Sequence, residues 1–170
     1  MGRDMGSSQI QALNPIALEY TEALKATLGE ALVSVVLFGS VARGEATPLS
    51  DIDLLVVVEN LPPGRFTRQE CLRGPDDAVM ARLQNLRSQG VLTDVHALLK
   101  TPAEAVLVRP LYLDMVEDAV ILYDRDGFFA KVLTDLQAAL HRLGARRLRR
   151  GRLRYWDLKP DYKPGEVFTL

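Results

Sequence analysis

The chain has 170 residues, of which 48% are hydrophobic and 25% are charged, and its net charge is −1; this balance is typical of one folded, water-soluble domain. The single cysteine, Cys71, and the two histidines exclude an internal disulfide framework and a Cys/His zinc site. No apolar run approaches the roughly 20 residues that cross a bilayer, and residues 1–9 lack the apolar core of a signal peptide, so we expect a cytoplasmic protein without a membrane partner.

Charged side chains are distributed unevenly along the chain. Residues 1–145 carry 13 basic and 19 acidic side chains, whereas residues 146–170 carry 8 basic and 3 acidic ones. We therefore expect three parts, which are a flexible leader at 1–9, one folded domain at 10–145, and a basic tail containing proline and glycine at 146–170.

The first half of the domain predicts a helix, a buried strand, a short turn and a second strand. Asn14 is suited to the N-cap of the helix and Pro15 to its first position. Apolar residues every four positions continue this helix until Gly29. The expected elements are a helix over 14–28, strands over 32–38 and 51–58, and a helical turn over 41–44.

The second half of the domain alternates helices with two more strands. Gly74-Pro75 predicts a break in the helical stretch between 65 and 89, and Thr101 before Pro102 predicts a helix cap. Strands are expected over 91–99 and 119–123. A helix is expected to start at residue 101, and two more are expected over 111–118 and 126–143. Strands that alternate with helices predict one α/β (α+β) domain with a mixed sheet of about four or five strands flanked by helices.

Two aspartates open the second expected strand. Side chains alternate along a strand, so Asp51 and Asp53 project from the same side while Ile52 faces the core. Two such carboxylates repel each other unless a cation lies between them, and hard oxygen ligands suit Mg²⁺. Taken alone, the pair is also compatible with an ordinary strand edge or a capping role.

A glycine-serine turn precedes this strand. Gly39 lets the backbone approach a ligand closely, and the N–H groups that follow it and the Ser40 hydroxyl can donate to phosphate oxygens. Arg43 has an alternative role on the surface as a partner of Glu45. The spacing from Gly39 to Gly44 is that of a Walker A loop, but Glu45 stands where that loop requires lysine, so this motif is excluded.

This combination resembles the signature of the DNA polymerase beta-like nucleotidyltransferase superfamily, and most of all its small members, the minimal nucleotidyltransferases. The similarity is close over residues 37–57, and the order of elements through Tyr123 agrees with the family's fold. The resemblance implies that residues 10–145 form a nucleotidyltransferase domain. The residues that carry it are Gly39, Ser40, Ala42, Arg43, Gly44 and Glu45, then Ser50, Asp51 and Asp53.

The resemblance also implies a mechanism. In the family, two metal ions, Mg²⁺ or Mn²⁺, bridge the triphosphate of ATP or another nucleoside triphosphate and the incoming hydroxyl. Asp51 and Asp53 would be metal ligands and catalytic residues, while Gly39 and Ser40 would contact the triphosphate. Arg43 either reaches the phosphates or organises the loop through hydrogen bonds, and the sequence leaves both roles open.

A third carboxylate usually completes the metal site in this family. We expect it to be Asp94, because a charge in the otherwise apolar stretch from Leu92 to Leu99 needs an explanation. The alternative is that Asp94 satisfies the turn at the start of this strand, and the next candidates are Asp114 and Asp118. His96 shares the face of Asp94 by alternation, but we leave it out of the catalytic set.

The expected function is transfer of a nucleoside monophosphate, AMP from ATP, to a hydroxyl of a small molecule or a protein. The alternative is an antitoxin-like module that neutralises a HEPN-domain ribonuclease by binding or by AMPylation, since minimal nucleotidyltransferases are often paired with such a protein. Both alternatives follow from the resemblance.

Six arginines lie between Arg146 and Arg154, followed by Tyr155 and Trp156. Basic residues interleaved with aromatic ones can bind nucleic acid. We favour the alternative that this stretch folds back onto the acidic residues of 1–145 or docks against a second chain, which leaves a homo-oligomer open.

Overall fold

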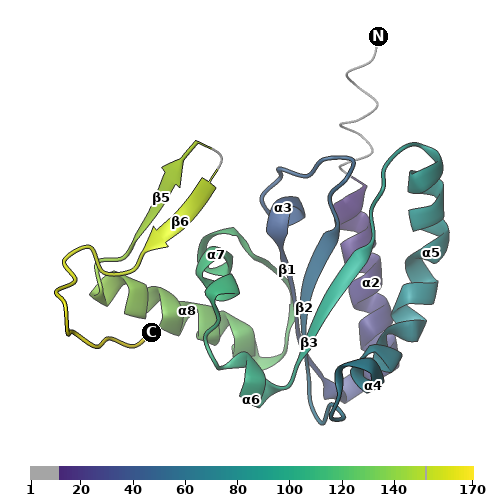
Figure 1. Cartoon of the computed structure of the whole chain (residues 1–170). Coiled ribbons are helices and arrows are strands. Elements are labelled where there is room, and N and C mark those ends of the chain that lie inside the picture. Colours follow the sequence, from purple (N-terminus) through teal and green to yellow (C-terminus); the bar gives the residue numbers. More distant parts are fainter. Residues whose placement is uncertain (1–11, 152) are drawn as a thin grey trace.

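The computed structural model describes residues 12–151 and 153–170, which form a four-stranded sheet covered by helices and a separate two-stranded hairpin (Figure 1). The expected leader at 1–9 lies outside the described residues. The sheet has the order β3-β2-β1-β4, in which β1 is antiparallel to β2 and β4, and β2 is parallel to β3. The mixed sheet predicted from the sequence is therefore confirmed. Its strands are β1 (Leu32–Phe38), β2 (Ile52–Val58), β3 (Val95–Lys100) and β4 (Val120–Asp124).

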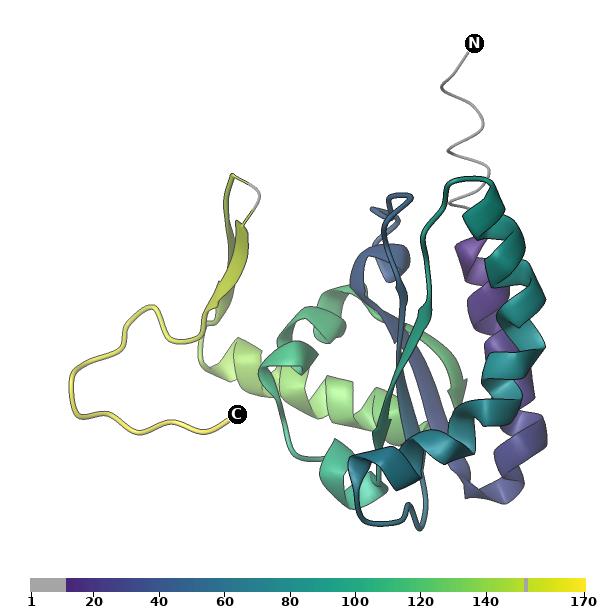
Figure 2. The same cartoon turned by 45° about the vertical axis from the view of Figure 1, so that its right-hand side comes forward.

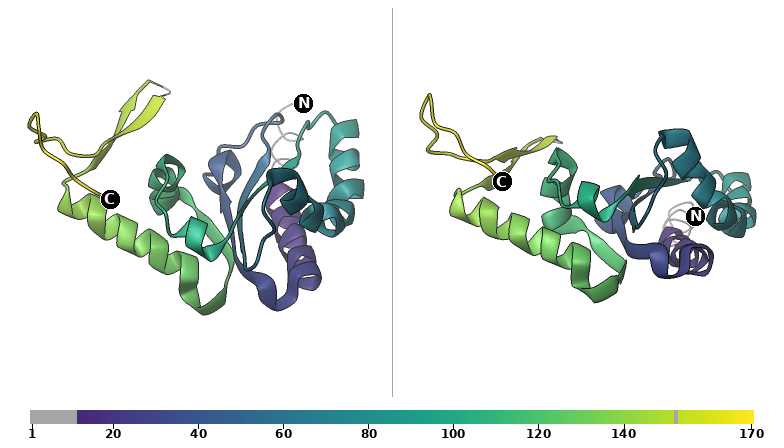
Figure 3. Two further views of the ribbon diagram at one scale, coloured as in Figure 1. Left: turned by 60° about the horizontal axis from the view of Figure 1, so that its bottom comes forward. Right: turned by 90° about the horizontal axis from the view of Figure 1, so that it is seen from below.

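Helices cover both faces of the sheet (Figures 2 and 3). On one face lie α2 (Leu13–Leu28) and α5 (Arg73–Ser88), and on the other lie α7 (Pro110–Asp118) and α8 (Phe128–Arg142). The shorter elements are α3 (Gly39–Ala42), α4 (Arg65–Gln69), α6 (Pro102–Ala105) and 3₁₀ turns at Gly29–Ala31, Glu70–Leu72 and Arg125–Gly127. Within the described part of the chain, no helix combines the length and the apolar character needed to span a bilayer.

The central strands are apolar on both faces because helices cover them on both sides. Leu54 and Val56 of β2 belong to the core under α2 and α5, whereas Leu55 and Val57 belong to the core under α7 and α8. Alternate residues of a strand point to opposite faces, so a strand covered twice needs a continuous apolar run. This run holds β2 rigidly and so fixes the position of Asp53 near its start.

Three predicted boundaries are wrong for reasons of packing. Helix α2 begins at Leu13 with Ala12 as its N-cap, so Asn14 is not the cap, because Leu13 is itself fully buried in the core. The break in the helical stretch lies at the 3₁₀ turn Glu70–Leu72, and Gly74-Pro75 falls in the first turn of α5, where proline is tolerated.

Strand β3 also begins later than predicted, at Val95 rather than at residue 91. The N–H of Val91 donates to the carbonyl of Leu86 at the end of α5, and the N–H of Leu92 donates to the carbonyl of Pro48. Residues 91–94 therefore connect α5 to the sheet, and Asp94 is the last residue of this connection.

The basic tail contains a hairpin that was not predicted from the sequence. Its strands are β5 (Arg146–Arg150) and β6 (Leu153–Asp157), and they pair antiparallel. Arg147 of β5 bonds to acidic residues of α7, and Trp156 of β6 packs against the core under α7 and α8, so the hairpin lies beside α7 (Figure 1).

Candidate functional site

The structure brings together Asp51, Asp53 and His96. Asp53 is opposite His96 in the parallel register of β2 and β3, and Asp51 directly precedes β2. Nδ1 of His96 lies 3.6 Å from Oδ2 of Asp51 and 4.0 Å from Oδ1 of Asp53. The side chains of Asp51 and Asp53 are 37% and 33% exposed, so both carboxylates remain open to a ligand while lying partly within the protein.

The ionised form of Asp53 is poorly stabilised. Burial, together with the charge of the neighbouring Asp51, raises the pKa of Asp53, and His96 and Arg43 oppose this rise. Two carboxylates that repel each other and are partly withdrawn from water suit a divalent cation, which would supply the missing positive charge. The donor set therefore fits the metal chemistry expected from the sequence.

Gly39 is held against the carboxylate of Asp53. Its φ is +76°, a left-handed conformation that residues with a Cβ rarely adopt, and a Cβ at this position would lie 2.4 Å from Oδ2 of Asp53. Gly39 is the first residue of α3, and the N–H of Glu45 donates to the carbonyl of Ser40 and closes the loop. The Gly39-Ser40 turn and the Asp53 carboxylate are thus immediate neighbours.

Asp94 reaches this site through its backbone. Its N–H donates a 3.0 Å hydrogen bond to Oδ1 of Asp51, and its carbonyl accepts one from the N–H of Ile52. Its carboxylate, in contrast, forms an ion pair of 2.6 Å with Nη2 of Arg87 on α5. Across residues 12–151 and 153–170, no three His, Cys, Asp or Glu side chains are grouped closely enough to hold a metal ion, so the Asp94 carboxylate is not joined to the pair.

The other two carboxylate candidates lie on α7, away from β2. Asp114 and Asp118 both accept hydrogen bonds from Arg147, and this contact lowers the pKa of Asp118. His96, which lies outside the catalytic set expected from the sequence, contacts both Asp51 and Asp53. Alternation from Asp94 puts His96 on the right face, but only the register of β3 against β2 shows that it meets Asp53.

An open cleft of about 690 Å³ lies beside the carboxylate pair. Asp53 and His96 line it together with Phe38 of β1 and the strongly exposed Phe66 of α4. Its size falls within the range of sites for small ligands, about 300–1,000 Å³. The cleft offers apolar surface next to two carboxylates, as a nucleoside or an acceptor group requires.

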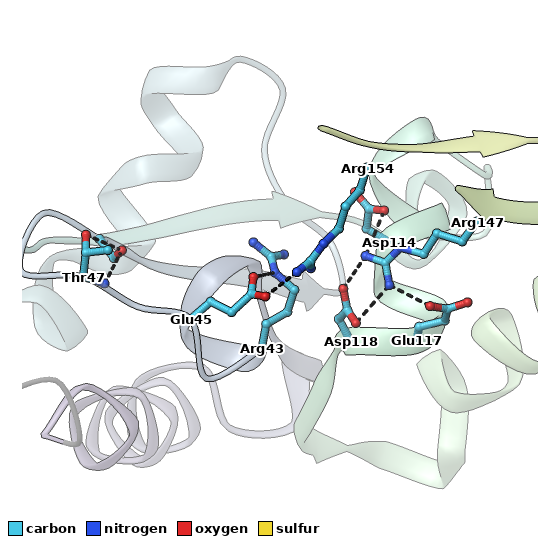
Figure 4. A network of polar contacts seen from close by, with 9 residues as sticks. Arg43, Glu45, Thr47, Asp114, Glu117, Asp118, Arg147 and Arg154 are labelled. Carbon is cyan, nitrogen blue, oxygen red and sulfur yellow. Dashed lines mark hydrogen bonds and ion pairs between the residues drawn. The ribbon is translucent and has the colours of Figure 1, made fainter. Parts of the chain in front are cut away.

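Arg43 takes part in a network of ion pairs with the hairpin (Figure 4). Its Nε donates to Oε2 of Glu45 at 3.0 Å, and Nη2 of Arg154 binds the other oxygen of Glu45. Arg147 binds Asp118 at 2.6 Å, and also Asp114 and Glu117 of α7. Arg43 thus bonds to a residue of its own loop, and these arginines of the basic tail fold back onto acidic residues of the domain, as favoured from the sequence.

Comparisons with known proteins identify the family of this chain. A family model described as the nucleotidyltransferase domain matches residues 19–123. A protein of Methanocaldococcus jannaschii, "Putative protein adenylyltransferase MJ1305", is 35% identical over 133 residues, which cover 77% of this chain and 85% of that protein.

Solved structures with a similar chain fold include a toxin–antitoxin complex with AMP-PNP, at 17% identity and a TM-score of 0.46 over 75% of this chain and 92% of that one. Another is a protein of Sulfolobus solfataricus described as a "putative nucleotidyltransferase", at 23% identity and a TM-score of 0.46 over 74% and 94% of the two chains. The match to the family model and the sequence identity to the archaeal protein decide the family. This chain belongs to the nucleotidyltransferase domain family.

Proposed function

We propose that the protein transfers AMP from ATP to a hydroxyl group, in a reaction that depends on Mg²⁺ or Mn²⁺. The observation that carries this proposal is the contact between the Gly39-Ser40 turn and the carboxylate of Asp53, with Asp51 on the same side of the chain. A turn that can donate to phosphates next to two carboxylates that suit a cation is what a metal-bound triphosphate needs. The adenylyltransferase name of the archaeal relative supports AMP as the group that is transferred.

Each residue has a distinct role in this proposal. Asp51 and Asp53 would hold the metal ions, which supply positive charge to the triphosphate and lower the pKa of the acceptor hydroxyl. Gly39 and Ser40 would hold the phosphates through backbone N–H groups and the serine hydroxyl. His96 of β3 lies next to both carboxylates and faces the adjoining cleft.

Asp94 is proposed as a further carboxylate of the site. Its backbone is already tied to Asp51, and the proposal requires a side-chain rotation that brings its carboxylate toward the pair. That rotation breaks the ion pair between Asp94 and Arg87, in which the side chain of Arg87 is 45% exposed and that of Asp94 is 54% exposed. An exposed pair of this kind is worth only about 0–1 kcal/mol, so a bound cation would compensate for its loss.

A protein side chain is the acceptor we favour. The archaeal relative is named a protein adenylyltransferase, and the cleft beside Asp53 is open enough to admit a side chain presented by another protein. The HEPN-domain ribonuclease expected as a partner remains a prediction from the family resemblance.

The experiment is label transfer from α-labelled ATP to protein in a cell extract, with and without Mg²⁺. Asp51→Asn and Asp53→Asn should each reduce transfer more than about 100-fold, because loss of the metal removes several kcal/mol of stabilisation of the transition state. Asp77→Asn is the matched control, since Asp77 is exposed on α5 and is not among the residues that line the cleft. Equal transfer by the Asp53→Asn and Asp77→Asn variants would refute the proposed role of the pair.

A further inference from the structure

One face of the hairpin is directed at the loop that follows α3. In the register of β5 and β6, Arg147 is opposite Trp156 and Arg149 is opposite Arg154, so these four side chains share a face. Arg154 binds Glu45 of that loop, and Arg147 and Trp156 both bond to Asp114 of α7. This face therefore meets the domain, while Arg150 lies on the opposite face and is exposed.

Four arginines line a pocket between the hairpin and this loop. The pocket has a volume of about 360 Å³, and its lining consists of Arg43, Glu45, Asp114, Arg147, Arg149 and Arg154. Figure 4 shows Arg43 and Arg154 converging on Glu45, with Arg147 directed toward α7. Every lining residue is charged, so the pocket suits a charged ligand.

Among the residues that line the pocket, four arginines outnumber the two carboxylates of Glu45 and Asp114. Arg147 pairs with Asp114, Glu117 and Asp118 of α7, and Arg43 and Arg154 share Glu45, so these three arginines have carboxylate partners. Among the described contacts of Arg149 is a 2.9 Å hydrogen bond from its Nε to the carbonyl of Gly151, which carries no charge. Arg149 and Arg154 also stand directly opposite each other, and like charges in that position destabilise a strand pair. An anion in the pocket would relieve this repulsion.

The position of Arg43 connects the pocket to the phosphate-binding turn. Arg43 directly follows α3, whose first two residues are Gly39 and Ser40, and its charge acts on Asp53 on one side and on Asp118 on the other. A polyphosphate held by Gly39 and Ser40 therefore has the arginine pocket next to it. Guanidinium groups bind phosphate oxygens through paired N–H donors, which a single lysine ammonium does not provide.

We propose that this pocket binds the β- and γ-phosphates of the nucleotide, with Arg149 and Arg154 of the hairpin acting beside Arg43. The inference rests on the proposed function, because it assigns the hairpin to the same nucleotide site. The phosphates take the place of Glu45 as the partner of Arg43 and Arg154. The basic tail is then a part of the substrate site that distinguishes a triphosphate from a monophosphate.

The test is calorimetry of the full chain with inorganic tripolyphosphate, ATP and AMP, each with Mg²⁺ and at constant ionic strength. Arg149→Ala should weaken the binding of tripolyphosphate and of ATP about tenfold or more, as expected for loss of a charge-assisted hydrogen bond. The affinity for AMP should be unchanged. The Arg149→Ala/Arg154→Ala double variant should bind tripolyphosphate and ATP more weakly still. Arg150→Ala, which removes the same charge from the opposite face, should change affinity less than about twofold.

Several results would overturn the inference. One is an equal loss of affinity for tripolyphosphate in Arg149→Ala and Arg150→Ala. Another is a loss of AMP binding in Arg149→Ala as large as the loss of ATP binding. A third is an absence of tripolyphosphate binding by the unmodified protein. Binding of single-stranded RNA that depends on Arg149, with no binding of tripolyphosphate, would also refute it and would assign the pocket to nucleic acid. Circular dichroism of each variant checks that the fold is intact.

Failure of this inference is distinguishable from failure of the proposed function. If the unmodified protein transfers AMP and Arg149→Ala leaves the KM for ATP unchanged, the pocket assignment is wrong and the activity stands. If the protein binds tripolyphosphate through Arg149 but transfers no label from α-labelled ATP, the pocket stands and the activity is wrong.

Discussion

The carboxylate of Asp53 lies against the Cα of Gly39, so closely that a Cβ at position 39 would stand 2.4 Å from Oδ2 of Asp53. Gly39 directly follows β1 and Asp53 lies near the start of β2, and the antiparallel pairing of these strands, with Phe38 opposite Asp53, brings both residues to one edge of the sheet. The contact joins the Gly39-Ser40 turn to the carboxylate of Asp53 without any intervening side chain.

Gly39→Ala should abolish activity and destabilise the fold by about 1–3 kcal/mol, because it combines a strained φ with a clash against Asp53. Gly44→Ala is the matched control, since Gly44 has a φ of +67° but no atom lies within 4 Å of the place that a Cβ would take. The measurements are urea unfolding and label transfer from α-labelled ATP. If both alanine variants lose the same activity, the contact with Asp53 has no special role.

Asp53→Asn should make the metal-free protein more stable at pH 7, while it removes activity. Burial raises the pKa of Asp53 above its ordinary value of 3.8, so the stability associated with its protonated form is present at low pH and is lost as the pH rises through the raised pKa. The gain from Asp53→Asn should therefore vanish below about pH 3.8. Urea unfolding in the presence of a chelator, at pH 7 and at pH 3, measures the difference in the free energy of unfolding between Asp53→Asn and the unmodified protein.

At pH 7, adding Mg²⁺ should make the unmodified protein more stable than Asp53→Asn, because a cation bound by the carboxylates stabilises the unmodified protein and not the variant. Asp77→Asn serves as the control and should follow the unmodified protein. A stability gain for Asp53→Asn that is the same at pH 3 and pH 7 would contradict the proposed repulsion.

Thr101→Ala should destabilise the protein by about 1 kcal/mol. The Thr101 side chain accepts from the N–H of Glu104 at 3.2 Å, and the Glu104 carboxylate accepts from the N–H of Thr101 at 3.0 Å, which forms a capping box at the start of α6. Thermal unfolding monitored by circular dichroism measures the loss. Thr67→Ala on α4, an exposed threonine of a similarly short helix, should have a smaller effect.

Glu104→Gln should reduce the pH dependence of stability in acid. Hydrogen bonds from Arg68, and then from the N–H of Thr101, lower the pKa of Glu104 from 4.5 to about 2. This contribution to stability is present above pH 4.5 and is lost as the pH falls towards 2. Urea unfolding at several pH values in this range gives the free energy of unfolding as a function of pH. Its slope against pH should be shallower for Glu104→Gln than for the exposed control Glu70→Gln. Identical slopes would rule out the Arg68 contact in solution.

Arg147→Ala should release the hairpin from α7. Arg147 is 15% exposed and contacts three acidic side chains, so its loss should destabilise this docking by about 1.5–3 kcal/mol. Trp156 is the single tryptophan of the chain and packs at this contact, so its fluorescence reports on docking directly. We expect a shift to longer wavelength in Arg147→Ala and none in the exposed control Arg146→Ala. An unchanged spectrum in Arg147→Ala would contradict the observed contact.

The central strands and the turn at Gly39-Ser40 could be predicted from the sequence because local signals define them. The run from Leu32 to Phe38 is apolar on both faces except at Ser34, and Gly39 ends it where the chain needs a positive φ. The family signature rests on this turn and on Asp51 and Asp53, which are close together in the sequence.

Features that depend on distant pairings were not predicted. Strand β5 has arginine at every position except Leu148, which gives no hydrophobic pattern, and the hairpin is stabilised by its contacts with α7 and the adjoining core. The contact of Arg87 with the Asp94 carboxylate depends on how α5 lies against the sheet, and the contact of His96 with Asp53 depends on the register of β3. The role of Asp94 in metal binding and the HEPN-domain partner remain predictions.

The central claim is that this chain transfers the nucleotidyl group of ATP rather than its terminal phosphate. Parallel reactions with α-labelled and γ-labelled ATP, each with Mg²⁺ and with the Asp51→Asn variant as the control, test it most directly. We predict that the acceptor gains label from the α-position alone and that Asp51→Asn transfers none. Label from the γ-position, or transfer that is undiminished in Asp51→Asn, would contradict the account.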